Sequence, residues 1–315
     1  MNDHFKSIIL ESTGATSFTE EEVIQHLWSG YGKIIRLKLK DNNIDSVVVK
    51  YVQLPLHKHH PRGWNTDIGH NRKVKTYQVE MNWYDQYSKS SMARLPHCLA
   101  IEPKDDEVLI ILEDLDKAGY HLRKQSVEWE DISSCLKWLA QFHASYLGAN
   151  PNGLWEVGTY WHLKTRPHEL EVLDDLRLKE AAPHINEKLN SCKYKTLVHG
   201  DAKLANFCFA KDGKVAGVDF QYVGGGCGMK DVAYFIGSCL SERECKSLET
   251  KILDTYFAFL QEALEEKNEA LETEWRSLYW VAWADFHRFL KGWSPGHWKI
   301  NNYSEYITAE VIKSL

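Results

Sequence analysis

Short apolar runs separated by polar turns mark the first part of the chain. Residues 34–39, 46–52 and 108–112 have the composition and length of strands, and the last of these is continuously apolar, as a buried strand is. The polar segment 41–43 separates the first two runs, as a turn between adjacent strands does. A further strand pair is expected to begin at Leu95. We therefore expect a β-sheet in the first part of the chain.

Longer segments have apolar residues at the three- and four-residue spacing of an amphipathic helix. In 126–147 this stripe comprises Ile132, Leu136, Leu139, Phe142, His143 and Tyr146. Because His143 belongs to the stripe, we interpret it as a hydrogen-bonded core residue. Other helices are expected at 19–28, with Ile24 and Leu27 on the apolar side, at about 74–87, at 241–264, where Ser241 to Glu244 forms a capping-box pattern, and at about 270–291.

The most informative stretch runs from Leu197 to Asp231. An apolar pair precedes His199-Gly200-Asp201, and Asn206 follows five positions after Asp201. A hairpin is predicted next, because Asp212-Gly213 lies between two apolar runs and both turn positions tolerate a positive φ. The second strand of this hairpin delivers Asp219. The loop and the hairpin are therefore expected to bring Asp201, Asn206 and Asp219 to the same edge.

These residue types suit phosphoryl transfer. That reaction needs metal ions on the phosphates and an oriented nucleophile, with little covalent help from the protein. Asn206 and Asp219 supply the hard oxygen ligands that Mg²⁺ prefers, and Asp201 can accept the proton of an attacking hydroxyl group. For each element alone, an ordinary turn or strand end is the alternative. Their joint spacing favours the catalytic interpretation.

The order His-x-Asp, four residues, Asn and then Asp-Phe resembles the catalytic core of protein kinases. Gly200 stands where those enzymes have Arg, and Gln221 where they have Gly. With Gly200, the stretch resembles the small-molecule branch of the kinase-like superfamily: aminoglycoside phosphotransferases, choline kinases and ecdysteroid kinase-like proteins. The resemblance implies an α+β, bilobal protein-kinase-like fold. Its N-lobe (1–114) would hold an antiparallel sheet with one key helix, and its C-lobe (115–315) would be mostly helical.

The resemblance also implies roles in the second half of the chain. Asp201 would be the catalytic base, Lys203 would steady the γ-phosphate of ATP, and Asn206 and Asp219 would hold Mg²⁺. His199 and Asp231 would support the catalytic loop. The glycine run 224–228 lacks the Lys-Ser/Thr of a Walker phosphate loop, so we interpret it as a chain that turns tightly beside the substrate.

In the first half of the chain the resemblance implies a nucleotide-binding set. Lys50 resembles the strand lysine that holds the α- and β-phosphates, and Glu80 is its expected ion-pair partner. An exposed strand lysine and a plain surface carboxylate are the respective alternatives. Gly30 and Gly32 match part of a phosphate-covering glycine loop, with an ordinary loop as an equal alternative. The segment that resembles the adenine-binding hinge is Glu113, Asp114 and Leu115.

Two further clusters invite functional interpretations. The aromatic segment 275–298 could line an acceptor pocket through Trp280, Trp283 and Asp285, since choline kinases bind a quaternary ammonium by cation–π attraction. Core packing is the alternative for each tryptophan. Histidines gather in 54–75, at His57, His59 and His60, but no carboxylate or cysteine lies there at a ligand-like helical spacing. We therefore expect a polar insertion there rather than a metal site.

Composition narrows the class of protein. The 315 residues suffice for two lobes, and a net charge of −6 gives no reason to expect a nucleic-acid partner. The seven scattered cysteines contain no Cys-x-x-Cys pair, which favours reduced thiols in the cytoplasm. Neither a membrane-spanning apolar run nor a signal-peptide h-region is apparent, so no membrane association is expected.

The sequence thus predicts a monomeric or homodimeric enzyme that moves the γ-phosphate of Mg-ATP to a hydroxyl group of a small molecule. A nucleotide-binding pseudokinase scaffold is one rival, which intact Asp201, Asn206 and Asp219 oppose. A protein kinase is another, which the short glycine segment and the missing Arg oppose. Choline-like amines, aminoglycosides, sterols, sugars and amino-acid derivatives all fit this scaffold as acceptors.

Overall fold

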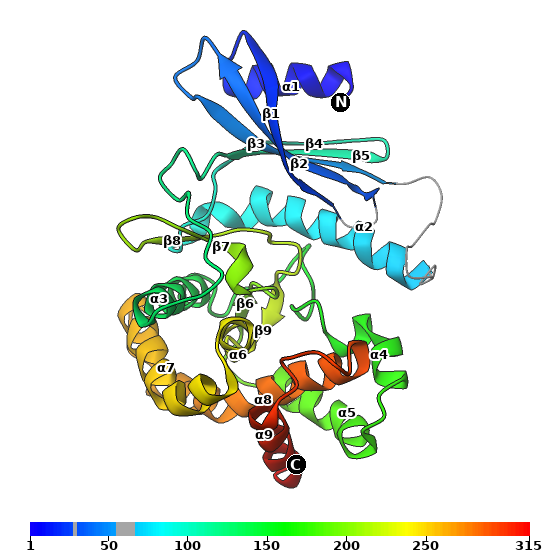
Figure 1. Cartoon of the computed structure of the whole chain (residues 1–315), viewed down its shortest axis with the longest axis vertical. Helices are drawn as coiled ribbons and strands as arrows, with labels where there is room; N and C mark the ends of the chain where they lie inside the picture. Colours follow the sequence, from blue (N-terminus) through cyan, green and yellow to red (C-terminus); the bar gives the residue numbers. More distant parts are fainter. Residues whose placement is uncertain (28–29, 55–66) are drawn as a thin grey trace. The chain divides into compact units, whose positions relative to one another are not determined.

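A computed structural model describes residues 1–27, 30–54 and 67–315 of the chain. The chain forms two compact units, each with its own contacts (Figure 1). Unit 1 comprises Met1–Lys89, Leu95–Leu122 and Cys208–Ala216, and unit 2 comprises Ser90–Arg94, Arg123–Phe207 and Gly217–Leu315. The fold class is α+β, as predicted. The boundary predicted after Asp114 stays a prediction.

Unit 1 is built on one antiparallel sheet of five strands in the order β1-β2-β3-β5-β4. The strands are β1 (Ser17–His26), β2 (Gly32–Lys40), β3 (Ser46–Gln53), β4 (Cys98–Lys104) and β5 (Glu107–Glu113). β3 and β5 are the most buried of them, and unlike β2, which also lies inside the sheet, they have few charged residues. The strands expected at 34–39, 46–52 and 108–112 are all confirmed.

The sheet is accompanied by two helices. Helix α1 (Asp3–Thr13) begins at Asn2, whose side chain accepts a hydrogen bond from the Phe5 amide, and ends at Gly14 with φ +73°. Its Phe5 and Ile9 are buried in the core formed by β2, β3 and β5. Helix α2 (Asp67–Asn82) continues into a π-helical turn, η2 (Trp83–Tyr87), and a short 3₁₀ turn, η3 (Ser88–Ser90). The helix predicted at about 74–87 lies within α2 and η2.

The prediction of a helix at 19–28 was wrong, because 17–26 forms strand β1. This strand pairs with β2 from Ser17↔Lys40 to His26↔Lys33, with two register shifts. Of the two residues placed on the apolar side of the expected helix, Ile24 is 45% exposed, whereas Leu27, just after the strand, is buried. Backbone pairing with β2 outweighs the local preference of this Glu-rich segment.

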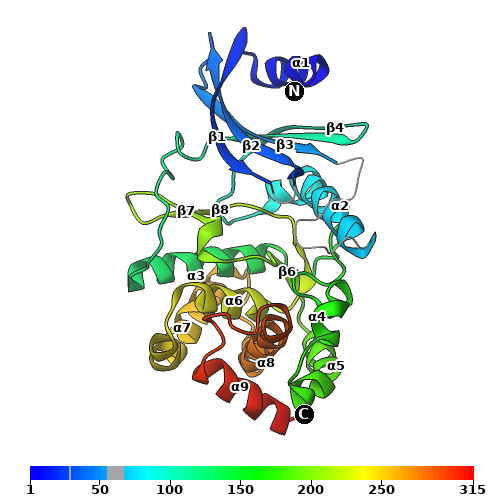
Figure 2. The same ribbon diagram turned by 45° about the vertical axis from the view of Figure 1, so that its right-hand side comes forward.

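Unit 2 is mostly helical (Figure 2). Helix α8 packs against α4, α5, α6 and α9, and α3 packs against α7. The helices are α3 (Trp129–Ser145), η4 (Leu163–Thr165), α4 (Pro167–Glu171), α5 (Leu176–Asn190), η5 (Leu204–Asn206), α6 (Met229–Cys239), α7 (Glu242–Ala263), α8 (Glu269–Trp293) and α9 (Asn302–Lys313). The helices expected at 126–147, 241–264 and 270–291 are confirmed, and the capping box of Ser241 and Glu244 is present.

Short strands flank the central loop. β7 (Phe207–Phe209) and β8 (Val215–Gly217) form the predicted hairpin, while β6 (Thr196–Val198) pairs with β9 (Gly224–Gly226). The glycine run therefore begins as a strand, not as the tight turn expected from its composition. Close packing explains the glycines, because a Cβ on Gly224 would lie 2.2 Å from the Trp155 carbonyl oxygen.

Two negative observations complete the fold. Within the described ranges, none of the helices combines the length and the apolar character that crossing a bilayer requires. All seven cysteines are free thiols.

Candidate active site

Asp201 lies in the loop between β6 and η5, and its carboxylate is buried among polar side chains. Its Oδ2 accepts hydrogen bonds from Lys203 Nζ at 2.8 Å and Asn206 Nδ2 at 3.1 Å. Its Oδ1 accepts a hydrogen bond from the Tyr234 hydroxyl at 3.1 Å. Both carboxylate oxygens thus accept hydrogen bonds from side chains of the surrounding loop and of α6.

Burial raises the pKa of Asp201, and the nearby carboxylate of Asp219 raises it further, while the Lys203 ammonium lowers it. The net pKa lies above the ordinary value of 3.8. For Lys203, burial lowers the pKa and Asp201 raises it, with a net rise. A carboxylate with a raised pKa accepts a proton more readily than an exposed one, which suits a general base.

A second aspartate, Asp231, holds the backbone of this loop. Its Oδ2 accepts the His199 amide at 2.5 Å, and its Oδ1 accepts the Gly200 amide at 2.9 Å. The fully buried Asp231 also bonds His143 Nε2 at 3.1 Å, and His143 Nδ1 bonds the Tyr256 hydroxyl at 2.7 Å. This network ties the start of the loop to α3, α6 and α7, and His143 is a hydrogen-bonded core residue, as its spacing predicted.

His199 links the loop to the strand that precedes Asp219. Its Nδ1 accepts the Asp201 amide at 3.2 Å, which leaves Nε2–H to donate to the Val218 carbonyl at 3.1 Å. The Val218 amide in turn donates to the Asn206 carbonyl at 3.0 Å. Asn206 and Asp219 are therefore held in one hydrogen-bonded framework with Asp201.

Gly200 has no room for a side chain. Its φ is +79°, and a Cβ there would lie 2.2 Å from the Tyr222 carbonyl oxygen. An Arg at this position, as in protein kinases, would clash with the backbone of the segment after Asp219. The glycine is thus a requirement of this loop's packing as well as a departure from the protein-kinase pattern.

Asp219 has a strained backbone. Its φ is +71°, one of four positive values among the non-glycine residues of the described chain. Such a conformation costs on the order of 1 kcal/mol for a residue with a side chain. Asn206 uses its Nδ2 for Asp201, so its Oδ1 and the Asp219 carboxylate are hard oxygen donors on one framework. This donor chemistry fits Mg²⁺, which takes its other ligands from phosphates and water.

In unit 1, Lys50 and Glu80 form a buried ion pair. Lys50 Nζ lies 2.6 and 2.9 Å from the two Glu80 carboxylate oxygens, and the two residues are 3% and 2% exposed. Lys50 comes from β3 and Glu80 from α2. The pair expected from the sequence is therefore present within unit 1, and the exposed alternatives for both residues do not apply.

The other predicted nucleotide-binding residues also lie in unit 1. Gly30 has a φ of +76°, and a Cβ on Gly32 would lie 2.0 Å from the Tyr51 carbonyl oxygen, so strand packing alone requires glycine at 32. At the expected hinge, the Glu113 amide donates to the His97 carbonyl at 2.8 Å. The Asp114 carboxylate accepts from Arg36 Nε at 2.7 Å and Ser46 Oγ at 2.6 Å. Leu115 is buried.

Trp280, Trp283 and Asp285 have different contacts in the structure, and their role in an acceptor pocket stays a prediction. Trp280 donates to Glu249 and lines a surface cavity of about 460 Å³, whose lining includes neither of the other two. Trp283 packs edge-to-face on Tyr303. Asp285 is buried, pairs with Arg288 at 2.9 Å and accepts from Trp161 Nε1 at 3.0 Å. Their contacts are those of helix packing, the alternative given for this segment.

Two residues near Asp201 escaped the sequence analysis: Tyr234, six positions into α6, and Lys299, between α8 and α9. The Tyr234 ring lies 5.2 Å from the Lys299 ammonium. Neither residue stands at a fixed spacing from the loop, so only tertiary packing reveals them. Residues 28–29 and the histidines His57, His59 and His60 lie outside the described residues. Within the described ranges no group of His, Cys, Asp and Glu is arranged to hold a metal by itself.

Two family models match parts of the sequence. The ecdysteroid kinase-like family matches residues 35–150, and a model described as "DUF1679: Uncharacterized oxidoreductase dhs-27" matches residues 169–278. No curated protein matches significantly. The predicted resemblance to the kinase-like small-molecule phosphotransferase superfamily is confirmed by the ecdysteroid kinase-like match together with the fold.

Solved structures share the fold at low sequence identity. An amicoumacin kinase, hAmiN, in complex with AMP-PNP, Ca²⁺ and Ami has a TM-score of 0.58 and 13% identity, over 100% of this chain and 93% of that one. The macrolide 2′-phosphotransferase MphH from Brachybacterium faecium has a TM-score of 0.50 and 12% identity, over 98% of this chain and 97% of that one. These likenesses establish the kinase-like fold.

Proposed function

We propose that this protein is an ATP-dependent phosphotransferase that moves the γ-phosphoryl group of Mg-ATP to a hydroxyl group of a small molecule. The observation that carries the proposal is the buried Asp201 carboxylate, with its raised pKa, in one framework with Lys203, Asn206 and Asp219. The structure of hAmiN contains AMP-PNP, an ATP analogue, and this supports a nucleotide as the phosphoryl donor.

In the proposed reaction, the acceptor oxygen forms a bond to the γ-phosphorus. The bond from that phosphorus to the β–γ bridging oxygen breaks, and ADP leaves. The hydroxyl proton passes to the Asp201 carboxylate. Lys203, which bonds Asp201 Oδ2 at 2.8 Å, stabilises the charge that develops on the transferred group.

Asn206 and Asp219 would hold Mg²⁺. A bound Mg²⁺ neutralises phosphate charge and orients the phosphate chain. In unit 1, Lys50, braced by Glu80, would bind the α- and β-phosphates, and Glu113 to Leu115 would bind adenine. A phosphate contact of Gly30 and Gly32 is part of the same proposal. We also propose a cytoplasmic location, which the free cysteines support.

Two other functions have less support. A nucleotide-binding scaffold without transfer activity would not need the arrangement of Asp201, Lys203 and Asn206. The description of one family model names an oxidoreductase, but the sequence has no Gly-x-Gly-x-x-Gly. The sheet of unit 1 is moreover antiparallel, whereas the dinucleotide-binding fold uses a parallel one.

The proposed function is tested by ADP release from Mg-ATP in the presence of pooled hydroxyl-bearing metabolites, with ATP binding measured separately by calorimetry. We expect at least one pool to stimulate ADP release. ATP binding without any acceptor-dependent release would favour the scaffold. Absence of ATP binding would contradict the proposal.

A further inference from the structure

Lys299 has an unusual environment for a partly buried cation. Its ammonium lies 5.2 Å from the ring centroid of Tyr234, 5.7 Å from that of Phe286 and 5.6 Å from that of Trp298. Within 1–27, 30–54 and 67–315, the ammonium has no carboxylate partner and donates no hydrogen bond. Aromatic faces attract a cation but satisfy none of its three N–H donors.

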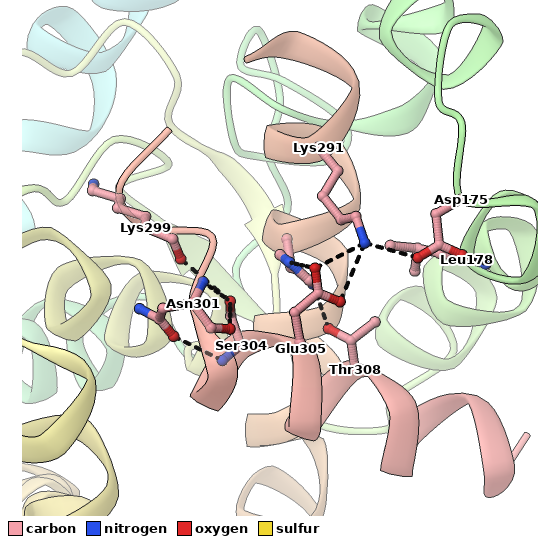
Figure 3. Close-up of polar contacts among 9 residues, drawn as sticks. Asp175, Leu178, Lys291, Lys299, Asn301, Ser304, Glu305 and Thr308 are labelled. Carbon is pink, nitrogen blue, oxygen red and sulfur yellow. Dashed lines mark hydrogen bonds and ion pairs between the residues drawn. The ribbon is translucent and has the colours of Figure 1, made fainter. Parts of the chain in front are cut away.

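The backbone of Lys299 is nevertheless firmly held. Its amide donates to His297 Nδ1 at 3.2 Å, and its carbonyl accepts from Ser304 Oγ at 3.3 Å. Ser304 also caps α9 reciprocally with Asn301. Figure 3 shows the Lys299 side chain extending away from these contacts. The ammonium is thus presented from a fixed base, as a preorganised binding group is.

Tyr234 connects this ammonium to the candidate catalytic base. Its ring lies next to Lys299, and its hydroxyl donates to Asp201 Oδ1 at 3.1 Å. Asp201 and Lys203 both lie close enough to influence the pKa of Lys299. Two ammonium groups, those of Lys203 and Lys299, therefore lie in the surroundings of one carboxylate.

We propose that Lys299 binds an anionic group of the acceptor, a carboxylate or a phosphate, while the acceptor hydroxyl is held at Asp201. The inference rests on the proposed function and specifies the class of its substrate. An anion satisfies the N–H donors that the aromatic rings leave unused. Choline-like and aminoglycoside acceptors are disfavoured, because their cationic groups would be repelled by Lys203 and Lys299.

The ligand could instead be the phosphoryl group in transfer, which is also an oxyanion. The two sources differ in what they predict. If Lys299 binds the acceptor, its removal weakens anionic acceptors selectively. If it binds the phosphoryl group, its removal slows transfer to every acceptor equally, and even to water.

The first experiment measures ADP release by wild type, Lys299→Gln and Lys299→Arg with three pools: hydroxy acids, neutral polyols and sugars, and hydroxylated amines. We expect wild type to favour the hydroxy acids. Lys299→Gln should lower kcat/KM for them by about 10- to 100-fold, mainly through KM, with the KM for ATP unchanged. Lys299→Arg, which keeps the charge, should restore part of the loss. Lys291→Gln is the control for removing a nearby ammonium.

The second experiment needs neither turnover nor a variant. Trinitrobenzenesulfonate labels exposed amines, and peptide mass spectrometry locates the label on Lys299 in the intact wild-type chain. Glycerate should slow this labelling, and glycerol and choline should not. Equal labelling with all three compounds would overturn the inference.

The two claims fail in different ways. ADP release that occurs only with amines or neutral alcohols, and is unchanged in Lys299→Gln, would refute the anionic acceptor and leave the phosphotransferase intact. An equal loss with every pool in Lys299→Gln would assign the ammonium to the phosphoryl group instead. Absence of ATP binding would refute the phosphotransferase, and the labelling result would then decide for Lys299 alone.

Discussion

Two lysines eight positions apart, Lys291 and Lys299, have opposite surroundings. At the end of α8, Lys291 donates to Asp175 at 2.9 Å and to both Glu305 oxygens at 2.9 and 3.2 Å (Figure 3). Lys299, before α9, lies among aromatic rings, and its ammonium forms no ion pair with a carboxylate of the described residues. One cation is neutralised by its own chain, and the other is not.

The comparison distinguishes two kinds of charged side chain: those whose ion pairs stabilise the fold, and those that remain available to bind a ligand. Lys291 pins α8 to α9 and to the cap residue of α5. Lys299 has no such ion pair, and a cation without a counter-charge costs stability. Asp201 is paired with Lys203 at 2.8 Å, but its proposed role is in the reaction rather than in joining elements of the fold. We therefore expect variants near Asp201 to change turnover and variants near Lys291 to change stability.

The largest effect is expected for Asp201→Asn. An amide cannot take the hydroxyl proton, so kcat should fall by about 10²- to 10⁴-fold. ATP affinity and thermal stability should change little. Steady-state ADP release and calorimetry measure these quantities, and Asp212→Asn, in the exposed hairpin turn, is the matched control. Equal turnover of Asp201→Asn and wild type would remove Asp201 from the mechanism.

Glu80→Gln should change both the stability of the fold and the kinetics with ATP. Removing the partner leaves the Lys50 ammonium in a buried site, which typically costs about 3–5 kcal/mol. Urea unfolding should show this loss, and the KM for ATP should rise because Lys50 is no longer braced. A stable variant with normal ATP affinity would show that the pair is dispensable.

The third prediction concerns pH and Lys299. Burial lowers the pKa of Lys299 to about 8, Lys203 lowers it too, and Asp201 and Cys239 raise it. The pKa of Lys203 is raised, and burial raises the pKa of Cys239 to about 12. Burial and the Lys299 ammonium lower the pKa of His297. These three neighbours therefore keep their charge state near pH 8. Burial raises the pKa of Tyr234 well above its ordinary value, so Tyr234 stays protonated there.

Above pH 8 the Lys299 ammonium loses its proton, so kcat/KM for an anionic acceptor should fall. Stability should change in the opposite direction. Between about pH 8 and the ordinary value of 10.5, the unfolded chain binds the proton that the folded chain has lost, so this group makes unfolding less favourable as pH rises. Activity profiles and urea titrations measure the two slopes. A fall in kcat/KM that persists in Lys299→Gln would contradict the assignment.

The smallest effect is expected for Lys291→Gln. Its half-exposed contacts are worth only about 1 kcal/mol, because solvent screens partly exposed ion pairs. Turnover should match wild type. His287, whose Nε2 lies 3.5 Å from a Glu305 carboxylate oxygen, and then Lys291 lower the pKa of Glu305 to about 2, although burial opposes them. The stability from Glu305 is therefore present above pH 4.5 and lost as pH falls toward 2, and Lys291→Gln should flatten this loss in acid-unfolding curves.

The sequence predicted most of the features that have a repeating apolar pattern or a fixed residue spacing. β3, β5, α3, α7 and the β7–β8 hairpin follow from apolar periodicity and turn chemistry. The loop residues Asp201, Asn206 and Asp219 follow from their spacing. These features depend on neighbours in the chain, which a sequence displays directly.

What the sequence could not supply depends on tertiary contacts. β1 is a strand because β2 pairs with it, and the glycines of β9 are required by the Trp155 backbone. The Trp283 ring packs against Tyr303, and the Asp285 carboxylate pairs with Arg288. Lys299 is identified as a candidate binding residue only by its tertiary contacts, and no local sequence pattern distinguishes it from Lys291.

The most direct test follows labelled phosphate from Mg-[γ-³²P]ATP into an acceptor. Wild type and Asp201→Asn are compared with the pool that stimulates ADP release. We predict a labelled phosphoester with wild type and a loss of about 10²-fold or more with Asp201→Asn, at equal ATP occupancy. Labelled product at equal rates from both proteins, or no labelled product from wild type with ATP bound, would contradict phosphoryl transfer at Asp201.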